Sequence, residues 1–101
     1  MIRVSIMYPN APNRRFDMKY YTDKHMPMVN KILAPLGARY EVDRGIGTAE
    51  PGAQAPFVTV CQMYFKNMED LQRCMSQAGD LSSDIPNFTD AQPQFQISEM
   101  L

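Results

Sequence analysis

Residues 57–79, FVTVCQMYFKNMEDLQRCMSQAG, join the clearest strand pattern of the chain to its clearest helix pattern. Residues 57–66 are rich in β-branched and aromatic side chains and are apolar on both alternating faces, which predicts a central strand. Asn67 then serves as a helix N-cap, with Glu69 and Asp70 in the first turn. The apolar stripe of this helix is formed by Leu71, Cys74, Met75 and Ala78. We therefore describe the other predicted elements by their position before or after this strand–helix pair.

Upstream of residue 57 the sequence predicts a strand, a helix and another strand. The first strand, IRVSIMY at residues 2–8, alternates apolar Ile2, Val4 and Ile6 with Arg3, Ser5 and Met7. The second strand covers residues 38–47, where Tyr40, Val42 and Ile46 alternate with Arg39, Glu41 and Asp43. Residues 48–56 contain small residues, Pro and Gly, which predicts a loop.

The helix between these strands begins near Phe16, with Asp17 placed to bind first-turn amides, and Pro35 and Gly37 end it. Its pattern directs Met26, Val29, Ile32 and Leu33 inward. Pro27 disfavours helical geometry at the preceding residue and lacks an amide donor. We therefore expect a bend or a restart of the helix near His25.

Downstream, residues 80–90 predict a short helical turn and a loop, and residues 93–100 predict a last strand. In that strand Phe95 and Ile97 lie opposite Gln94, Gln96 and Ser98. The element order β-α-β-β-α-β is the split βαβ arrangement of the ferredoxin-like fold, an α+β class with a four-stranded antiparallel sheet and both helices on one face. A chain of 101 residues has room for one hydrophobic core, so we expect a single domain over residues 1–101.

Composition excludes several classes of function. The net charge of -1 and the scattered basic residues argue against nucleic-acid binding. No apolar run approaches the roughly 20 residues that span a bilayer, so no membrane segment is expected. The N-terminus, MIRVSIMYPN, reaches Pro and Asn too early for a signal peptide. Cys61 and Cys74 lack a CxxC spacing, and two buried free thiols indicate a reducing, cytoplasmic setting.

The second face of the predicted sheet needs a cover. Val58, Val60 and Tyr64 lie on it if the other side of the central strand faces the helices, and such a surface is too apolar to remain in water. Face-to-face pairing with a second copy would cover it and enclose a cavity, which predicts a homodimer. The polar groups on this face favour a ligand site with a few convergent polar groups. The predicted ligand-binding residues there are Ser5, Gln62, Tyr64 and Gln96.

His25 is the only histidine of the chain and the leading candidate for acid-base chemistry. An imidazole with an ordinary pKa of about 6.5 exchanges protons at neutral pH. Tyr21 and Met28 lie one turn before and after it, so the three share a helical face. Tyr21 is the predicted catalytic partner and Met28 a ligand contact. The alternative is a helix-end imidazole bound to a backbone carbonyl, with Tyr20 and Tyr21 serving as core aromatics with a polar tip.

Cofactor and metal patterns are lacking in the sequence. One histidine argues against zinc, and no metal site or cofactor is predicted. A haem needs only one axial histidine, so counting leaves haem open. No Ser or Cys occurs in a recognisable triad motif, and residues 45–47, GIG, do not continue into a phosphate-binding glycine pattern.

Four segments resemble the EthD family, named after ethyl tert-butyl ether degradation. They are VSIMYPN (4–10), RFDMKYYTDKHMPMV (15–29), DIPNFTD (84–90) and QISEM (96–100). The resemblance implies a ferredoxin-like protomer that forms a dimeric α+β barrel. Original members of the family accompany a cytochrome P450 system, and relatives of the same architecture include polyketide cyclases, an isomerase, cofactor-independent monooxygenases and haem-binding enzymes. Close relatives often carry a second histidine where this chain has Gln62.

Two classes of function follow. The first is a cofactor-independent enzyme that binds a small hydrophobic or aromatic molecule and moves protons with His25, helped by Tyr21 or Tyr64, in a dehydration, cyclisation or isomerisation. The second is a non-catalytic binding protein that serves an oxygenase or degradation pathway. A ligand that is processed favours the first class, and a ligand that is bound unchanged favours the second.

Overall fold

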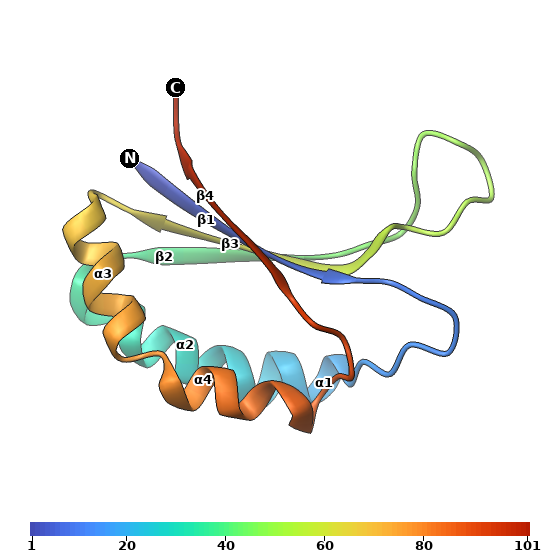
Figure 1. The fold of residues 1–101 in the computed structure, drawn as a ribbon, viewed down its shortest axis with the longest axis horizontal. Helices are drawn as coiled ribbons and strands as arrows, with labels where there is room; N and C mark the ends of the chain where they lie inside the picture. Colours follow the sequence, from blue (N-terminus) through green and yellow to red (C-terminus); the bar gives the residue numbers. More distant parts are fainter.

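The structure, a computed structural model, describes residues 1–101 as a sheet with helices on one face (Figure 1). The four strands are β1 (Ile2–Pro9), β2 (Arg39–Arg44), β3 (Phe57–Phe65) and β4 (Gln94–Glu99). All neighbouring strands are antiparallel, and their order in the sheet is β2-β3-β1-β4. The structure confirms the predicted ferredoxin-like arrangement and the central place of the strand at residues 57–65.

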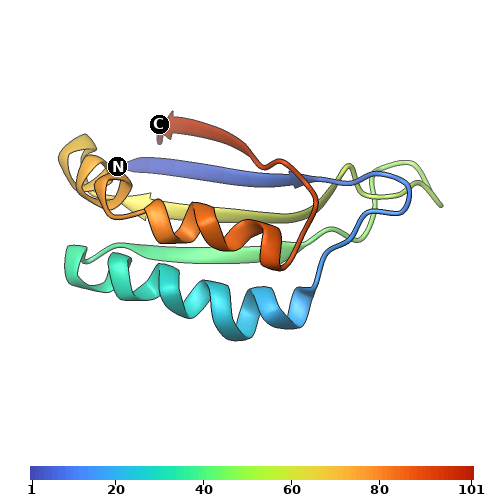
Figure 2. The same ribbon diagram turned by 60° about the horizontal axis from the view of Figure 1, so that its bottom comes forward.

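Two helical arms pack side by side against the sheet (Figure 2). The first arm contains α1 (Met18–Tyr20), a π-helical turn η1 (Tyr21–His25), α2 (Met26–Leu33) and a 3₁₀ turn η2 (Ala34–Leu36). The second arm contains α3 (Met68–Ser76), α4 (Gly79–Asp84) and a 3₁₀ turn η3 (Ile85–Asn87). The predicted caps are present, since Asp17 accepts from the Tyr20 amide and Asn67 from the Asp70 amide. None of these helices has the length and apolar character needed to cross a membrane.

The restart expected near His25 takes the form of the π turn. The Met26 amide donates to the carbonyl of Tyr21, five residues back, and α2 then begins with Pro27 at its start. Proline tolerates the first turn of a helix because amides there need no intrahelical acceptor. Pro27 is thus accommodated by widening one turn, and both Tyr21 and His25 become buried. Such π turns occur frequently at functional sites.

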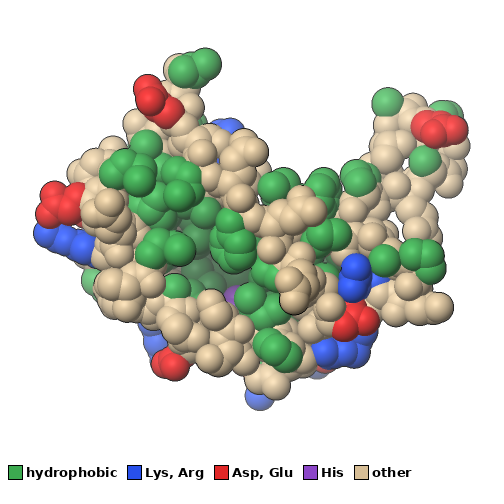
Figure 3. Space-filling model, in the orientation of Figure 1, with side chains coloured by type: hydrophobic (Ala, Val, Ile, Leu, Met, Phe, Trp, Pro, Cys, Tyr) green, Lys and Arg blue, Asp and Glu red, His purple; other side chains and the backbone are tan.

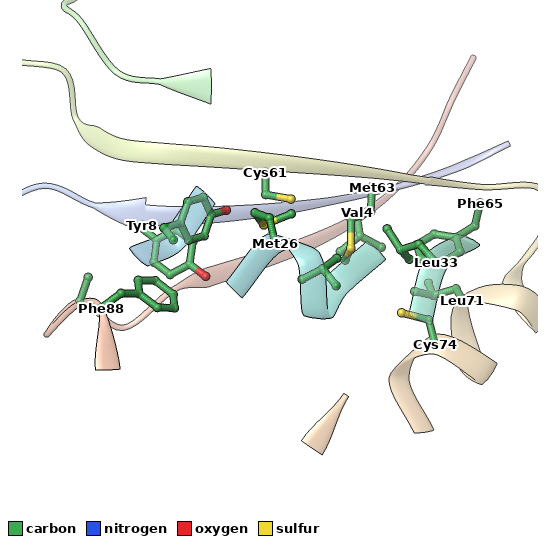
Figure 4. Close-up of a cluster of buried hydrophobic side chains, with 13 residues drawn as sticks. Val4, Tyr8, Met26, Leu33, Cys61, Met63, Phe65, Leu71, Cys74 and Phe88 are labelled. Atoms are coloured by element: carbon green, nitrogen blue, oxygen red, sulfur yellow. The ribbon is translucent and has the colours of Figure 1, made fainter. Parts of the chain in front are cut away.

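The core lies between the sheet and the helical arms. Met26 of α2 lies beneath Cys61 of β3, Met63 lies near Val4, and Phe65 and Leu71 meet Leu33 at one end of the core (Figure 4). At the other end Tyr8, Phe16, Tyr21 and Phe88 make edge-to-face and tilted contacts with centroid distances of 5.1–5.8 Å. Aromatic pairs in these geometries add to the stabilisation from burial.

Three apolar side chains are less covered than their sequence patterns predict. Ile46 was expected in a strand but is 94% exposed, because β2 stops at Arg44 and residues 45–56 form a loop that projects beyond the sheet (Figure 1). Met75 belongs to the predicted apolar stripe of α3, yet it is 53% exposed. Phe95 faces the helices, since it pairs with Ile6, but no helix covers it at the edge of the sheet.

Candidate active site

A cavity of about 90 Å³ lies between the sheet and the helical arms. In the space-filling view it is a hollow lined by hydrophobic side chains, with the only histidine visible inside it (Figure 3). Thirteen of its 15 lining residues are hydrophobic, and the other two are His25 and Ser82. The cavity therefore presents very few polar groups to anything that enters it.

His25 is paired with a buried carboxylate from the second helical arm. Its Nδ1 lies 2.8 Å from Oδ2 of Asp84, and both side chains are almost fully buried. The other carboxylate oxygen of Asp84 accepts a hydrogen bond of 2.6 Å from the Tyr20 hydroxyl and one of 3.0 Å from the Asn87 amide. Three donors thus converge on one carboxylate.

This arrangement determines which atoms carry protons. Burial alone would raise the pKa of Asp84, but hydrogen bonds from Tyr20, Asn87 and His25 outweigh it and lower the pKa below its usual value. Asp84 is therefore a carboxylate that only accepts, so the His25 atom facing it, Nδ1, carries the proton. In the neutral imidazole Nε2 then holds a lone pair, and this atom makes no hydrogen bond within the chain. A lone pair without a partner beside a cavity is the geometry of a general base.

Aromatic rings hold the imidazole in place. The Tyr21 ring stacks on it with a centroid distance of 5.6 Å and an interplanar angle of 16°, and Phe88 contacts it at 4.7 Å. Since the rings restrict the imidazole and Asp84 binds Nδ1, the direction of Nε2 is fixed. This is the orienting role that a carboxylate has in other His–Asp pairs.

The other titratable groups of the cavity keep their protons. Burial is the main cause that raises the pKa of Tyr21 and of Tyr8 far above the ordinary tyrosine value, and the nearby Cys61 raises both further. Burial also raises the pKa of Cys61 to about 12. At neutral pH these phenols and this thiol are neutral, so they can donate hydrogen bonds but are neither bases nor thiolate nucleophiles. His25 is the one cavity group suited to take up a proton.

The structure brings together only part of the predicted site. Tyr21 and His25 both line the cavity, as their shared helical face predicts. Met28 is half-buried and does not line it, whereas the next residue of α2, Val29, does. The ligand contact of Met28 therefore stays a prediction.

The remaining predicted ligand residues share the opposite face of the sheet. Ser5 is paired with both Gln62 and Gln96 across the strands, and its hydroxyl donates to Gln62 Oε1 at 2.6 Å. The Tyr64 ring lies between two guanidinium groups, 5.3 Å from that of Arg3 and 4.1 Å from that of Arg39. These side chains converge as expected, but the sheet separates them from His25 and its cavity, since alternate strand residues point to opposite sides.

Asp84 was missed at the sequence level, as was the contribution of Tyr20 and Asn87 to the site. Asp84 lies 59 positions after His25, and a separation of that size gives no indication that the two side chains meet. The available signal was the DIPNFTD segment, which was recognised as family-specific without a role for its first residue. The structure shows that this segment and the segment around His25 meet at one hydrogen-bonded pair.

Comparison with known proteins now places the chain in a family. The model of the EthD domain matches residues 13–92. The chain belongs to the EthD family. An EthD-like protein of known structure from Ralstonia eutropha JMP134 is 39% identical and superposes with a TM-score of 0.90, over 97% of this chain and 89% of that chain. A search of curated proteins gave no match.

Two further solved structures share the fold. An ethyl tert-butyl ether degradation family protein from Bacillus halodurans C-125 has 24% identity and a TM-score of 0.77, covering 100% of this chain and 99% of that chain. SnoaB, a cofactor-independent oxygenase from Streptomyces nogalater, has 12% identity and a TM-score of 0.55, covering 98% and 90% of the two chains. At these identities the likeness shows the fold and nothing about chemistry.

The side chains of the site suit neither a metal ion nor a haem. No three His, Cys, Asp or Glu side chains lie close enough together to hold a metal ion. The cavity of about 90 Å³ is well below the roughly 300–1,000 Å³ of sites that enclose drug-sized molecules. A haem is larger than this space, so His25 does not fit as its axial ligand in this conformation.

Proposed function

We propose that this EthD family protein is a cofactor-independent enzyme in which His25 acts as general base on a small hydrophobic or aromatic molecule. The observation that carries the proposal is the Nε2 atom of His25, which has no partner in the chain at the cavity while Asp84 holds Nδ1. Nε2 is not among the buried side-chain atoms that lack a partner, so it retains solvent contact and a molecule in the cavity can reach it.

The reaction begins with transfer of a proton from the bound molecule to Nε2. The electron pair of the broken C–H or O–H bond stays on the substrate as an enolate or phenolate, and the imidazolium forms a stronger pair with the ionised Asp84. Returning the proton to another carbon completes an isomerisation. Attack of the carbanion on a carbonyl group followed by protonation of the new alkoxide completes a cyclisation, and loss of water then gives a dehydration.

The surroundings of His25 support this role in two ways. The apolar cavity excludes water, which strengthens the interaction between the imidazolium and Asp84. The phenol of Tyr21 remains protonated and lines the same cavity, so it can donate a hydrogen bond to the oxygen of an enolate. Tyr21 thereby acts as a donor in the proposal and His25 as the proton carrier.

The test is protein-catalysed exchange of substrate protons with solvent. 2-Butanone, a small ketone whose uncatalysed exchange is slow, is incubated in D₂O with the protein, and deuterium incorporation is followed by NMR. The wild type is expected to accelerate exchange, and His25→Ala to lower the rate by about 10²–10⁴-fold, as for loss of a general base. His25→Ala must retain its circular dichroism spectrum for this comparison.

The matched control is Gln62→Ala, on the face of the sheet away from the cavity, which is expected to leave exchange unchanged. Equal exchange by wild type and His25→Ala, together with binding of the ketone in unchanged form, would contradict the enzymatic role. That outcome would instead favour a binding protein that accompanies another enzyme.

We also propose that the outer face of the sheet pairs with a second copy of the chain. Val58 and Val60 lie there beside Tyr64, and no helix covers them. Arg3 Nε is buried without a hydrogen-bond partner, and an acceptor from a second copy would satisfy it. Sedimentation of Val60→Glu is expected to show a smaller species than the wild type, because a buried unpaired charge opposes association. A wild-type protein that sediments as a monomer at micromolar concentration contradicts this pairing.

A further inference from the structure

We infer that the ligand is an elongated apolar molecule, with a small reactive end that enters the cavity and a chain that lies outside it on Met75 and Phe95. The inference rests on the proposed function for the chemistry of the reactive end. Beyond that function, the inference specifies the shape of the substrate and names the surface that selects the length of its chain.

The size of the cavity limits what can reach His25. An apolar cavity of roughly 150 Å³ binds one benzene molecule. The cavity beside His25 has about 90 Å³, so it accepts a carbonyl unit with its neighbouring carbons, and the ring of an aromatic ligand would have to remain outside it. Any larger hydrophobic ligand must therefore leave most of its length outside the cavity.

The opening of the cavity carries an apolar surface of its own. Met75 of α3 and Phe95 of β4 both line the cavity, yet they are 53% and 56% exposed. They come from different parts of the fold, since β4 is an edge strand of the sheet and α3 belongs to the second helical arm (Figure 1). Two large apolar side chains that are both cavity wall and surface form a continuous path from the interior to the solvent.

The same surface continues along the sheet edge. Ile97 follows Phe95 on the helix-facing side of β4 and is 54% exposed. Hydrophobic side chains gather around the hollow in the space-filling view (Figure 3). Exposed apolar patches of this kind mark binding sites, and their continuity with the cavity indicates a ligand that occupies both.

Methionine suits a surface that selects for length. Its flexible thioether adapts to chains of different shape, and Met75 lines the same cavity as Phe95. No charged side chain lines the cavity. An alkyl or similarly extended apolar chain therefore fits this surface better than a charged or highly hydroxylated one.

The test uses unbranched 2-alkanones from 2-butanone to 2-nonanone as probes. All carry the same small reactive end, so only the chain outside the cavity changes. Dissociation constants measured by NMR titration are expected to fall by up to about fourfold per added methylene, because each buried methylene contributes about 0.8 kcal/mol. A dissociation constant that stays the same from 2-butanone to 2-nonanone overturns the inference.

Variants separate this inference from the proposed function. Phe95→Ala and Met75→Ala are expected to reduce the gain per methylene. His25→Ala is expected to abolish exchange while preserving the gain per methylene. Ile46→Ala removes a side chain that is 94% exposed and far from the cavity, so it should change neither quantity.

A second copy of the chain is the competing occupant of this surface. Sedimentation of Phe95→Ala distinguishes the two, since the inference expects the mass of the wild type. If Phe95→Ala lowers the mass and the gain per methylene persists, the surface is an interface between copies and the inference is overturned.

Discussion

The two faces of the sheet hold polar side chains in different ways. On the outer face the Ser5 hydroxyl binds Gln62 and Tyr64 lies between two guanidinium groups, while Arg3 Nε is buried without a partner. On the helix-covered face Asp84 takes three donors, and His25 keeps one nitrogen available to the cavity that it lines. The comparison teaches that an accumulation of polar groups is a weaker sign of chemistry than an oriented His–Asp pair beside an apolar cavity.

The largest expected effect comes from removing the carboxylate of the helix-covered face. Asp84→Ala leaves the donors of His25, Tyr20 and Asn87 without their acceptor, and breaking a buried pair in this way typically costs about 3–5 kcal/mol. Urea denaturation should show this loss in the free energy of unfolding. Asp80→Ala, on the exposed side of the same helix, is the matched control and should change little.

Acid sensitivity should depend on the same carboxylate. The pKa of Asp84 is lower in the folded protein, so the unfolded chain binds the proton more readily. The ionised Asp84 therefore stabilises the fold above the unfolded pKa of about 3.9, and this contribution is lost as the pH falls through the folded pKa. Asp84→Asn should flatten the acid limb of the stability profile below about pH 5. Unfolding midpoints measured at several pH values test this expectation.

Asp90 provides the control for the acid limb. Its pKa is also lowered, mainly by the hydrogen bond from Arg14, but its side chain is 52% exposed. Solvent screening makes exposed pairs contribute little to stability. Asp90→Asn should therefore leave most of the acid limb in place, and an equal flattening by both variants would contradict the special position of Asp84.

A smaller effect is expected for Tyr20→Phe. The change removes one of the three donors to Asp84, so the free energy of unfolding should fall by less than in Asp84→Ala, which removes the acceptor of all three. Exchange of 2-butanone should persist at a reduced rate, since His25 and Asn87 still bind Asp84. Tyr40→Phe is the control, because Tyr40 is not among the donors to Asp84.

The smallest effect is expected on the outer face. Combining Ser5→Ala with Gln62→Ala removes both partners of one half-buried hydrogen bond, and the loss of stability should be about 1 kcal/mol or less. The rate of 2-butanone exchange should stay at the wild-type value. A fall in that rate would show that the outer face takes part in the chemistry, as the sequence patterns first indicated, and would remove the distinction between the two faces.

Much of the fold could be predicted because local patterns and the tertiary structure agree. The β-branched and aromatic run in residues 57–65, apolar on both faces, and the cap at Asn67 predicted a strand and a helix that the structure contains. The extent of β2 was overestimated, since alternation continues to Ile46 while pairing ends at Arg44. Alternation records which side chains share a face, but it carries no information on where a neighbouring strand stops.

Of the site, the sequence predicted His25 and Tyr21 but not the carboxylate that binds His25. His25 and Tyr21 stood out because a unique histidine and a neighbouring tyrosine share a helical face. Their partner Asp84 comes from the second helical arm, and nothing in its local sequence distinguishes it from other surface carboxylates. Met28 follows His25 by three residues in α2, but Val29, four residues after His25, lines the cavity in its place.

The amino-acid sequence by itself determined the element order, the two faces of each strand and the break in the first helix at Pro27. These features follow from alternation, capping and the missing amide of proline, all of which act over a few residues. Only the tertiary structure decided that His25 meets Asp84, and that the cavity lies on the helix-covered face of the sheet. The reason is that burial and hydrogen bonding between distant segments depend on how the two helical arms pack together, and no local pattern encodes that packing.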